Sequence, residues 1–412
     1  MRVNADEDMR RPVWLLDQLI DAARSPSTAS YQETRERLLV ETAKFVAAVS
    51  PERSEQFARS NGRDSLLATM AARLAVSDPA RSERLLNGVG PLWDRWTLVA
   101  MAELAVAVAP SDPRRAKKVL NEAASRAHQA GKEKTKALAD MATVVAPSDP
   151  RRAKHLIELA ARMGKEDRHV GVHDAAMAAI ALDLRLAERI ATSAGPRLNG
   201  LLLAEVARAA AATDPDRAVK IARSFKEPAE LAPLLADIAA KMATHKWSQA
   251  DSLISEADQL ARRIMDQRDH TVTMTSVIKA LATRDPDRAV ERAKAIAKDT
   301  GRPWPTGVVA GAIGAAQPER AERIATSIEN GLERTAALAA AAEAMAAVDP
   351  ERAERLCESL PNTYFALQEA LAHTAIAMAR ADIDRAEELA LSITHPHHRA
   401  EALLEVLRVV TA

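Results

Sequence analysis

The stretch ATRDPDRAVERAK, residues 282–294, contains the phrase on which the fold prediction rests. Asp285 precedes Pro286, and an arginine-alanine pair follows at Arg288 and Ala289. Aspartate is a favoured helix N-cap because its carboxylate accepts hydrogen bonds from the unpaired N–H groups of the first turn. Proline at the next position has no N–H to leave unsatisfied. The phrase therefore predicts a tight turn followed directly by a helix.

The same phrase recurs along the chain, and we call the place of its proline the turn position. Prolines occupy the turn position at Pro51, Pro79, Pro113, Pro150, Pro215, Pro286, Pro318 and Pro350, and degenerate copies have Leu184, Trp247 and Ile383 there. The steps between these positions are 28, 34, 37, 34, 31, 32, 39, 32, 32 and 33 residues. A period near 33 residues corresponds to one helical hairpin per repeat. We therefore expect an all-α fold, a right-handed α-solenoid of about eleven helix-turn-helix repeats.

An apolar pattern with the period of a helix precedes each phrase. Leu338, Ala341, Ala342 and Met345 stand at relative positions 0, 3, 4 and 7, which places them on one face of a helix. The same spacing is found at Leu67, Met70, Ala71 and Leu74, and at Met274, Val277, Ile278 and Leu281. Each repeat is thus expected to contain a helix A before the turn and a helix B after it.

The repeats divide the chain into two parts. Residues 46–412 are expected to form one continuous repeat domain. Residues 1–45 do not follow the pattern, and they predict two helices, Pro12 to Ala23 and Gln32 to Val49. Because a solenoid needs its terminal repeats covered, residues 1–45 are expected to be an N-terminal helical cap.

The repeat resembles those of tetratricopeptide-type proteins. The resemblance rests on the hairpin length, on a small residue in helix B such as Ala289, Ala321 or Ala353, and on the stretch ARADIDRAEELALSI, residues 379–393. It covers roughly residues 46–412 and implies a superhelix whose A helices line the concave side. The large aromatic residues of a standard tetratricopeptide repeat are replaced by Ala, Leu and Met. The chain therefore resembles a divergent, alanine-packed relative, and no ligand residues carry over.

Composition excludes several classes of protein. The 412 residues include 57 basic and 57 acidic side chains, so the formal net charge is zero. A general polyanion binder needs a basic surface, which makes a nucleic-acid partner unexpected. The single cysteine, Cys357, excludes a disulfide framework and a cysteine-based zinc or iron–sulfur site.

The expected location is the cytoplasm. No run of 18 or more apolar residues is present, so no membrane span is predicted. The N-terminus, MRVNADEDMRRP, lacks the apolar core of a signal peptide. Arginine outnumbers lysine, 42 against 15, and together with the abundant alanine this suggests a GC-rich bacterial source.

An arginine stands two residues after most turn positions. These arginines are Arg53, Arg81, Arg115, Arg152, Arg217, Arg288, Arg320, Arg352 and Arg385. They could form a basic ladder for phosphates or acidic peptides. We favour pairing with carboxylates or carbonyls of a neighbouring helix, because a feature of every repeat usually serves the stacking of the repeat.

A second row of polar residues lies in helix A, on the face about 150° from the apolar stripe. We call it the inner row; it runs Thr69, Ala100, Asp140, Asp174, Glu205, Asp237, Ser276, Val308, Ala340, His373 and Glu405. Four successive carboxylates, Asp140, Asp174, Glu205 and Asp237, predict an acidic strip that receives a basic or amine-bearing partner. Alternatively, these carboxylates pair with cations at the helix starts, Lys134, Arg168, Arg197 or Lys241.

Tryptophan and glycine mark two irregular joints. Trp247 replaces the turn proline, and Trp304 lies in the stretch DTGRPWPTG, residues 299–307. They are candidate binding anchors, since tryptophan is enriched at interaction hot spots, or else they fill these joints. The glycines of GVVAGAIGAA, residues 307–316, follow no strand and predict close helix packing instead of a phosphate site.

No metal, cofactor or catalytic site is predicted. His169 and His173 are four residues apart, but Val170 stands where the HExxH motif requires glutamate. His395, His397 and His398 share one turn, yet the sequence identifies no further ligands for them. No phosphate-binding loop, nucleophile motif or aspartate-rich cyclase motif is present.

The leading functional expectation is a non-enzymatic scaffold that binds a protein or peptide partner in the concave groove lined by helix A of each repeat. The candidate binding residues are Asp140, Asp174, Glu205, Asp237, His373, Trp247 and Trp304. One alternative is a helical enzyme with a small-molecule cavity inside the superhelix. Another is an RNA binder that reads one base per repeat, which the neutral charge and the scarcity of aromatic residues disfavour.

Overall fold

The structure is a computed structural model, and every element that it describes is a helix. It describes residues 14–15, 17–22, 32–49, 55–59, 64–90, 94–166, 171–242, 247–300, 304–360 and 364–410. The predicted all-α class is confirmed, since no strand occurs among these residues. None of the described helices is long and apolar enough to span a bilayer.

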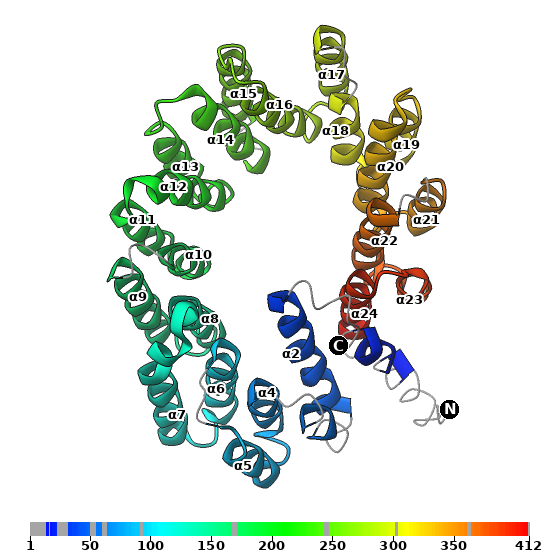
Figure 1. Cartoon of the computed structure of the whole chain (residues 1–412). Coiled ribbons are helices and arrows are strands. Elements are labelled where there is room, and N and C mark those ends of the chain that lie inside the picture. Colours follow the sequence, from blue (N-terminus) through cyan, green and yellow to red (C-terminus); the bar gives the residue numbers. More distant parts are fainter. Residues whose placement is uncertain are drawn as a thin grey trace. The chain divides into compact units, whose positions relative to one another are not determined.

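The chain divides into two compact units, whose helices are labelled in Figure 1. The middle unit is Glu36–Ala210, and the terminal unit combines Met1–Arg35 with Ala211–Ala412. Helices up to the end of the middle unit are α2 (Gln32–Val49), α4 (Asp64–Leu74), α5 (Pro79–Asn87), α6 (Arg95–Val108), α7 (Pro113–Arg126), η2 (Ala127–Glu133), α8 (Lys134–Val145), α9 (Pro150–Glu166), α10 (Val172–Leu182), α11 (Leu184–Ser193) and α12 (Pro196–Ala210).

The remaining helices belong to the terminal unit. They are α13 (Pro215–Ala222), α14 (Pro228–Lys241), α15 (Trp247–Ala261), α16 (Gln267–Ala282), α17 (Pro286–Thr300), α18 (Trp304–Ile313), α19 (Pro318–Thr326), α20 (Gly331–Met345), α21 (Pro350–Glu358), α22 (Tyr364–Met378), α23 (Ile383–Ser392) and α24 (Pro396–Val410). Residues 14–15 and 17–22 are also helical.

Helix B begins at the turn position in each repeat from Pro79 onward. The aspartate before the turn acts as predicted: Asp112 accepts from the backbone N–H of Arg115 at 2.9 Å, and Asp349 accepts from that of Arg352 at 3.1 Å. The aspartate cap is also present at two turn positions that lack proline, Leu184 and Ile383. Asp183 accepts from Arg185 N and Leu186 N, so α11 still begins at Leu184.

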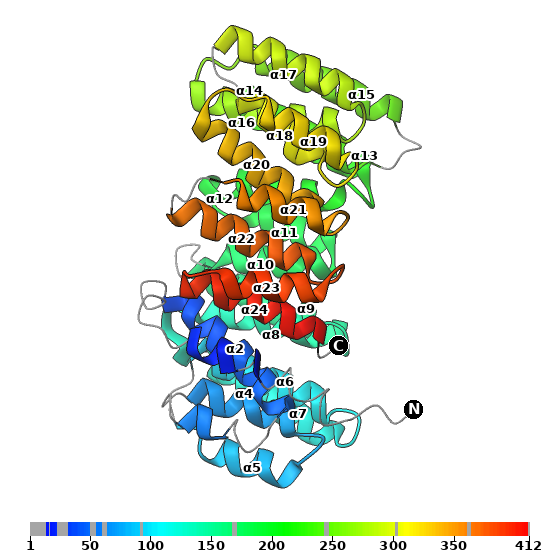
Figure 2. The same ribbon diagram turned by 90° about the vertical axis from the view of Figure 1, so that its right-hand side faces the viewer.

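The A helices pack on one another in chain order within each unit. In the middle unit these neighbours are α4, α6, α8, α10 and α12. In the terminal unit they are α14, α16, α18, α20, α22 and α24, and Figure 2 shows the last four stacked side by side. Across the turn, α6 packs on α7, α8 on α9 and α20 on α21. The predicted apolar stripe faces this packing, since Ala341, Ala342 and Met345 are fully buried.

Glycines let α18 and α20 approach closely. A Cβ atom at Gly307 or Gly311 would lie 3.0 Å from the Cβ of Ala337 or Ala340. At Gly314 it would lie 2.7 Å from the Cβ of Ala344. Real Cβ atoms avoid such distances, so the predicted role of these glycines in close helix packing is confirmed.

Both helices predicted for the N-terminal stretch occur. The second is α2, with the predicted bounds, and the first is present at residues 14–15 and 17–22. Leu15 and Leu19 are fully buried, and Gln18 Oε1 accepts a hydrogen bond from Arg399 Nη2 of α24 at 2.9 Å. Within the terminal unit, the first helix of the chain therefore lies against the last one.

Candidate functional site

A groove of about 770 Å3 lies across four neighbouring A helices of the terminal unit, α16, α18, α20 and α22. We call it the Trp304 groove, because Trp304, the first residue of α18, lies in its wall. Small residues make up its floor: Gly307, Gly311, Ala312, Ala340, Ala344 and Ala377. The close approach of α18 and α20 that the glycines permit therefore also shapes a shallow apolar surface.

The polar residues of the Trp304 groove come from α16 and α20. Thr275, Lys279 and Thr283 line it from α16, and Glu333 and Glu343 line it from α20. Glu333 differs from the other polar residues of the groove, because its Oε2 atom is buried and accepts no hydrogen bond from any described residue. A buried carboxylate oxygen without a donor is costly, and a cationic group of a ligand would relieve that cost.

Two of the predicted binding residues lie at this groove. Trp304 lines it, and His373 of α22 lies beside it, with Nδ1 3.5 Å from an oxygen of Glu343. Val308 and Ala340 of the inner row also line it, so the predicted face of helix A is the one that the groove exposes. Trp247 starts α15, but its side chain lies outside the described residues.

Two carboxylates of the predicted acidic strip, Asp140 and Glu205, pair with arginines of their own unit. Arg95 Nε of α6 donates to Asp140 Oδ2 at 2.6 Å, and Arg208 Nη1 donates to Glu205 Oε1 at 2.8 Å. Burial raises the pKa of Asp140, Arg95 opposes that rise, and the nearby charge of Asp174 adds to it. The structure thus brings Asp140 and Asp174 close enough to interact.

The four carboxylates of the predicted strip do not all belong to one unit. Asp140, Asp174 and Glu205 lie in the middle unit, and Asp237 lies on α14 in the terminal unit. The pairing of Asp140 with Arg95 was not predicted from the sequence. Of the cations that it named, Arg168 and the side chain of Arg197 lie outside the described residues.

The arginines after the turn are paired between successive B helices in the terminal unit. Arg320 donates to Asp287, Arg352 Nη1 donates to Glu322 Oε2 at 2.7 Å, and Arg385 Nη2 donates to Glu351 Oε1 at 2.8 Å. For these three arginines the predicted pairing with carboxylates of a neighbouring helix is confirmed. Arg53 lies outside the described residues.

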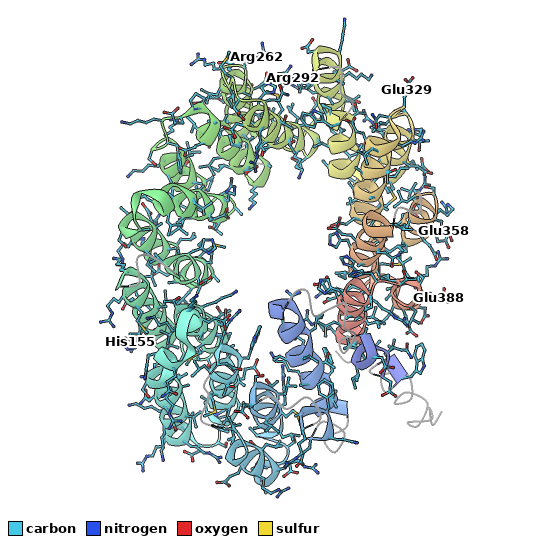
Figure 3. All side chains as sticks on the ribbon, viewed as in Figure 1. His155, Arg262, Arg292, Glu329, Glu358 and Glu388 are labelled. Atoms are coloured by element: carbon cyan, nitrogen blue, oxygen red, sulfur yellow. The ribbon has the colours of Figure 1, made fainter. Side chains whose placement is uncertain are left out.

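The residue after the turn position is acidic in most repeats of the terminal unit, but it is arginine on three B helices of the middle unit: Arg114 on α7, Arg151 on α9 and Arg185 on α11. Lys117 and Lys118 follow on α7, and Lys154 follows on α9, where it lies 3.5 Å from Asp183 Oδ2. Figure 3 shows His155 on the side of α9 that faces away from α8 and α10. Arg114, Lys117 and Lys118 of α7 and Arg151 of α9 are exposed.

Lys279, Glu333 and Glu343 were not among the binding residues predicted from the sequence. The repeat pattern could have identified Lys279 and Glu343. They stand seven residues before a turn position, as the groove residue Gly311 does. On a helix this position lies about 60° from the inner row, hence on the same face. Glu333 has no equivalent signal, since its burial depends on the neighbouring helices.

No protein-family model matches the chain, and neither a curated protein nor a solved structure does.

Proposed function

We propose that the chain is a right-handed α-solenoid of about eleven tetratricopeptide-like repeats. We further propose that it is a non-enzymatic scaffold, which binds a basic peptide segment of a partner protein in the groove lined by its A helices. The repeat period, the start of helix B at each turn position and the packing of successive A helices support the architecture.

The observation that carries the binding proposal is the Trp304 groove, with an apolar floor and carboxylates in its wall. An apolar side chain of the peptide packs on Ala340, Ala344 and Ala377, and Trp304 provides a large flat contact surface. A lysine or arginine of the same peptide donates to Glu333 or Glu343. The terminal unit has 36 acidic against 30 basic residues, so its charge also favours a basic segment.

Selection of random twelve-residue peptides displayed on phage, with the full-length chain immobilised, tests this proposal. We expect the enriched peptides to combine Lys or Arg with Leu, Ile or Phe. The affinity of one enriched peptide is then measured by fluorescence anisotropy for three variants. Ala340→Trp fills the groove and should abolish binding. Glu333→Gln removes one charge-assisted bond and should weaken binding about tenfold.

Ala315→Trp is the matched control, because Ala315 is exposed at the end of α18 and does not line the groove. It should bind like the wild type, and thermal melting followed by circular dichroism shows whether each variant folds. Enrichment of acidic peptides, or equal affinity of the Ala340→Trp variant, would contradict the proposal.

If no peptide is enriched while a small molecule binds and is turned over, the helical-enzyme alternative replaces the scaffold proposal. Retention on heparin with steep salt dependence, lost on substitution of inner-row residues, would instead favour the RNA alternative.

A further inference from the structure

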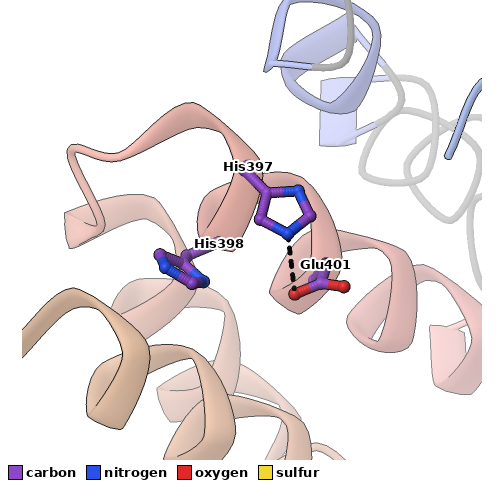
Figure 4. Close-up of side chains that lie close together, drawn as sticks. All are labelled: His397, His398 and Glu401. Carbon is purple, nitrogen blue, oxygen red and sulfur yellow. Dashed lines mark ion pairs between the residues drawn. The ribbon is translucent and has the colours of Figure 1, made fainter. Parts of the chain in front are cut away.

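Three potential metal ligands converge where α24 begins. The ligand atoms of His397, His398 and Glu401 all lie within 4.8 Å of one another. Figure 4 shows the two imidazoles and the carboxylate on the first turns of α24, with His397 Nε2 3.6 Å from Glu401 Oε2. The helix itself explains this arrangement, because Glu401 follows His397 by four residues and His398 by three.

We propose that His397, His398 and Glu401 form a binding site for a divalent transition-metal ion, with zinc as the best match. Two imidazole nitrogens and one carboxylate oxygen are a ligand set that zinc commonly takes in open sites, where water fills the fourth position. Zinc ligands stand about 2.0–2.2 Å from the ion, so their mutual distances are about 3–3.5 Å. Zinc binding therefore requires the ligand atoms, which now lie within 4.8 Å of one another, to move closer together.

The three ligand side chains are partly shielded from solvent. His398 is only 9% exposed, and the side chains of His397 and Glu401 are 14% and 25% exposed. The cluster is therefore partly buried and is not a group of fully exposed histidines.

A buried side chain of α22 holds the turn that presents these ligands. Gln368 Oε1 accepts from Thr394 N at 2.6 Å, from Thr394 Oγ1 at 3.0 Å and from His395 N at 3.0 Å. The ring of His395 in turn lies 4.8 Å from that of His398, measured between centroids. Gln368 is thus a positioning residue, since it fixes the backbone immediately before Pro396, the first residue of α24.

Zinc titration of the tag-free, full-length chain by isothermal calorimetry tests the site. We expect one zinc ion per chain, and with cobalt in place of zinc a visible absorption spectrum of four-coordinate type. Glu401→Gln should weaken binding at least tenfold while preserving the fold, and His398→Ala should abolish it. Gln368→Ala should weaken binding about tenfold without changing the stoichiometry, because it loosens the turn but removes no ligand.

Two controls separate this site from adventitious binding. Glu405→Gln changes a glutamate of the same helix that pairs with Arg408, and His155→Ala removes an exposed histidine of the middle unit. Both variants should bind zinc like the wild type. The proposal is overturned if the chain binds no zinc at micromolar concentration. It is also overturned if Glu401→Gln binds as tightly as the wild type, or if His155→Ala loses binding to the same extent.

Discussion

At the scale of single residues, an aspartate before most turn positions caps the B helix that follows. The turn between α18 and α19 has Gln317 instead, and the side chain of Gln317 makes no cap bond to the backbone of α19. Its backbone nevertheless has φ −142° and ψ 65°, close to the −138° and 74° of Asp349. The backbone at Gln317 is thus already arranged for a cap that its longer side chain does not provide.

Gln317→Asp should therefore stabilise the chain by about 1 kcal/mol, because the shorter carboxylate reaches the N–H of Arg320. Urea unfolding followed by circular dichroism measures the change. Gln317→Asn should give a similar gain without a charge. Gln317→Glu, which adds the charge at the wrong length, should give none. If the glutamate variant gains as much as the aspartate variant, helix-dipole electrostatics rather than capping accounts for the effect.

Asp349 caps α21, and its carboxylate is expected to make the stability of the chain depend on pH. Hydrogen bonding from Arg352 lowers the pKa of Asp349 below its ordinary value near 3.8. A carboxyl group with a lowered pKa in the folded state contributes stability above its ordinary pKa and loses it as the pH falls through the folded pKa. Asp349→Asn keeps a capping oxygen but removes this charge. We expect the wild type to melt higher than Asp349→Asn at pH 7, and the difference between the two melting temperatures to shrink as the pH falls below the ordinary pKa of 3.8. A difference that stays constant from pH 7 to pH 3 would contradict this explanation.

At the scale of helices, the contact between α18 and α20 depends on the absence of side chains. A Cβ atom at Gly314 would lie 2.7 Å from the Cβ of Ala344 and 3.0 Å from the carbonyl oxygen of Ala341. At Gly331, the first residue of α20, a Cβ atom would have no neighbour within 4 Å. The same substitution at these two glycines therefore separates packing from helix propensity.

Gly314→Ala should destabilise the chain by about 1–3 kcal/mol through overpacking. Gly331→Ala should instead be neutral or stabilise it by up to about 1 kcal/mol, because alanine restricts the unfolded chain. The shift of the urea midpoint measures both effects. An equal or larger loss at Gly331 would show that close helix approach is not what requires glycine. Peptide affinity in the Gly314→Ala variant should fall as well, since α18 and α20 share the Trp304 groove.

At the scale of the molecule, the net charge is zero because the opposite charges of the two units cancel. The middle unit carries 27 basic and 21 acidic residues, and the terminal unit carries 30 basic and 36 acidic residues. The formal charges of the two units are therefore +6 and −6. The zero net charge made a polyanionic partner unexpected for the chain as a whole. That expectation does not extend to the exposed basic residues of α7 and α9.

Retention on an ion exchanger responds to such a surface more than to the total charge. We expect the wild type to bind a cation exchanger at low salt and pH 7. The triple variant Arg114→Glu, Lys118→Glu and Arg151→Glu should pass through it. Changing Arg262, Arg263 and Arg334 to Glu alters the net charge by the same amount and should reduce retention much less. Equal loss in both triple variants would indicate that total charge, and not the α7 and α9 surface, controls binding.

The amino-acid sequence alone was sufficient to predict the all-α class, the starts of the B helices and the buried apolar stripe of the A helices. These features follow from local chemistry: Asp285 caps the turn before Pro286, and Leu338, Ala341, Ala342 and Met345 form one apolar stripe of a single helix. These features repeat about every 33 residues, so the copies support one another in predicting the same pair of helices. The pairing of arginines with neighbouring carboxylates followed from the same repetition.

Contacts between side chains of different helices, in contrast, became known only from the three-dimensional arrangement. Asp140 pairs with Arg95, which is 45 residues away, and one carboxylate oxygen of Glu333 is buried beside the Trp304 groove, which residues of α16, α18 and α22 also line. Distance along the sequence carries no information about such contacts, because they depend on the separation and rotation of whole helices. Even Glu401, within one helix of His397, gained significance only when burial and the bonds of Gln368 fixed the turn before it.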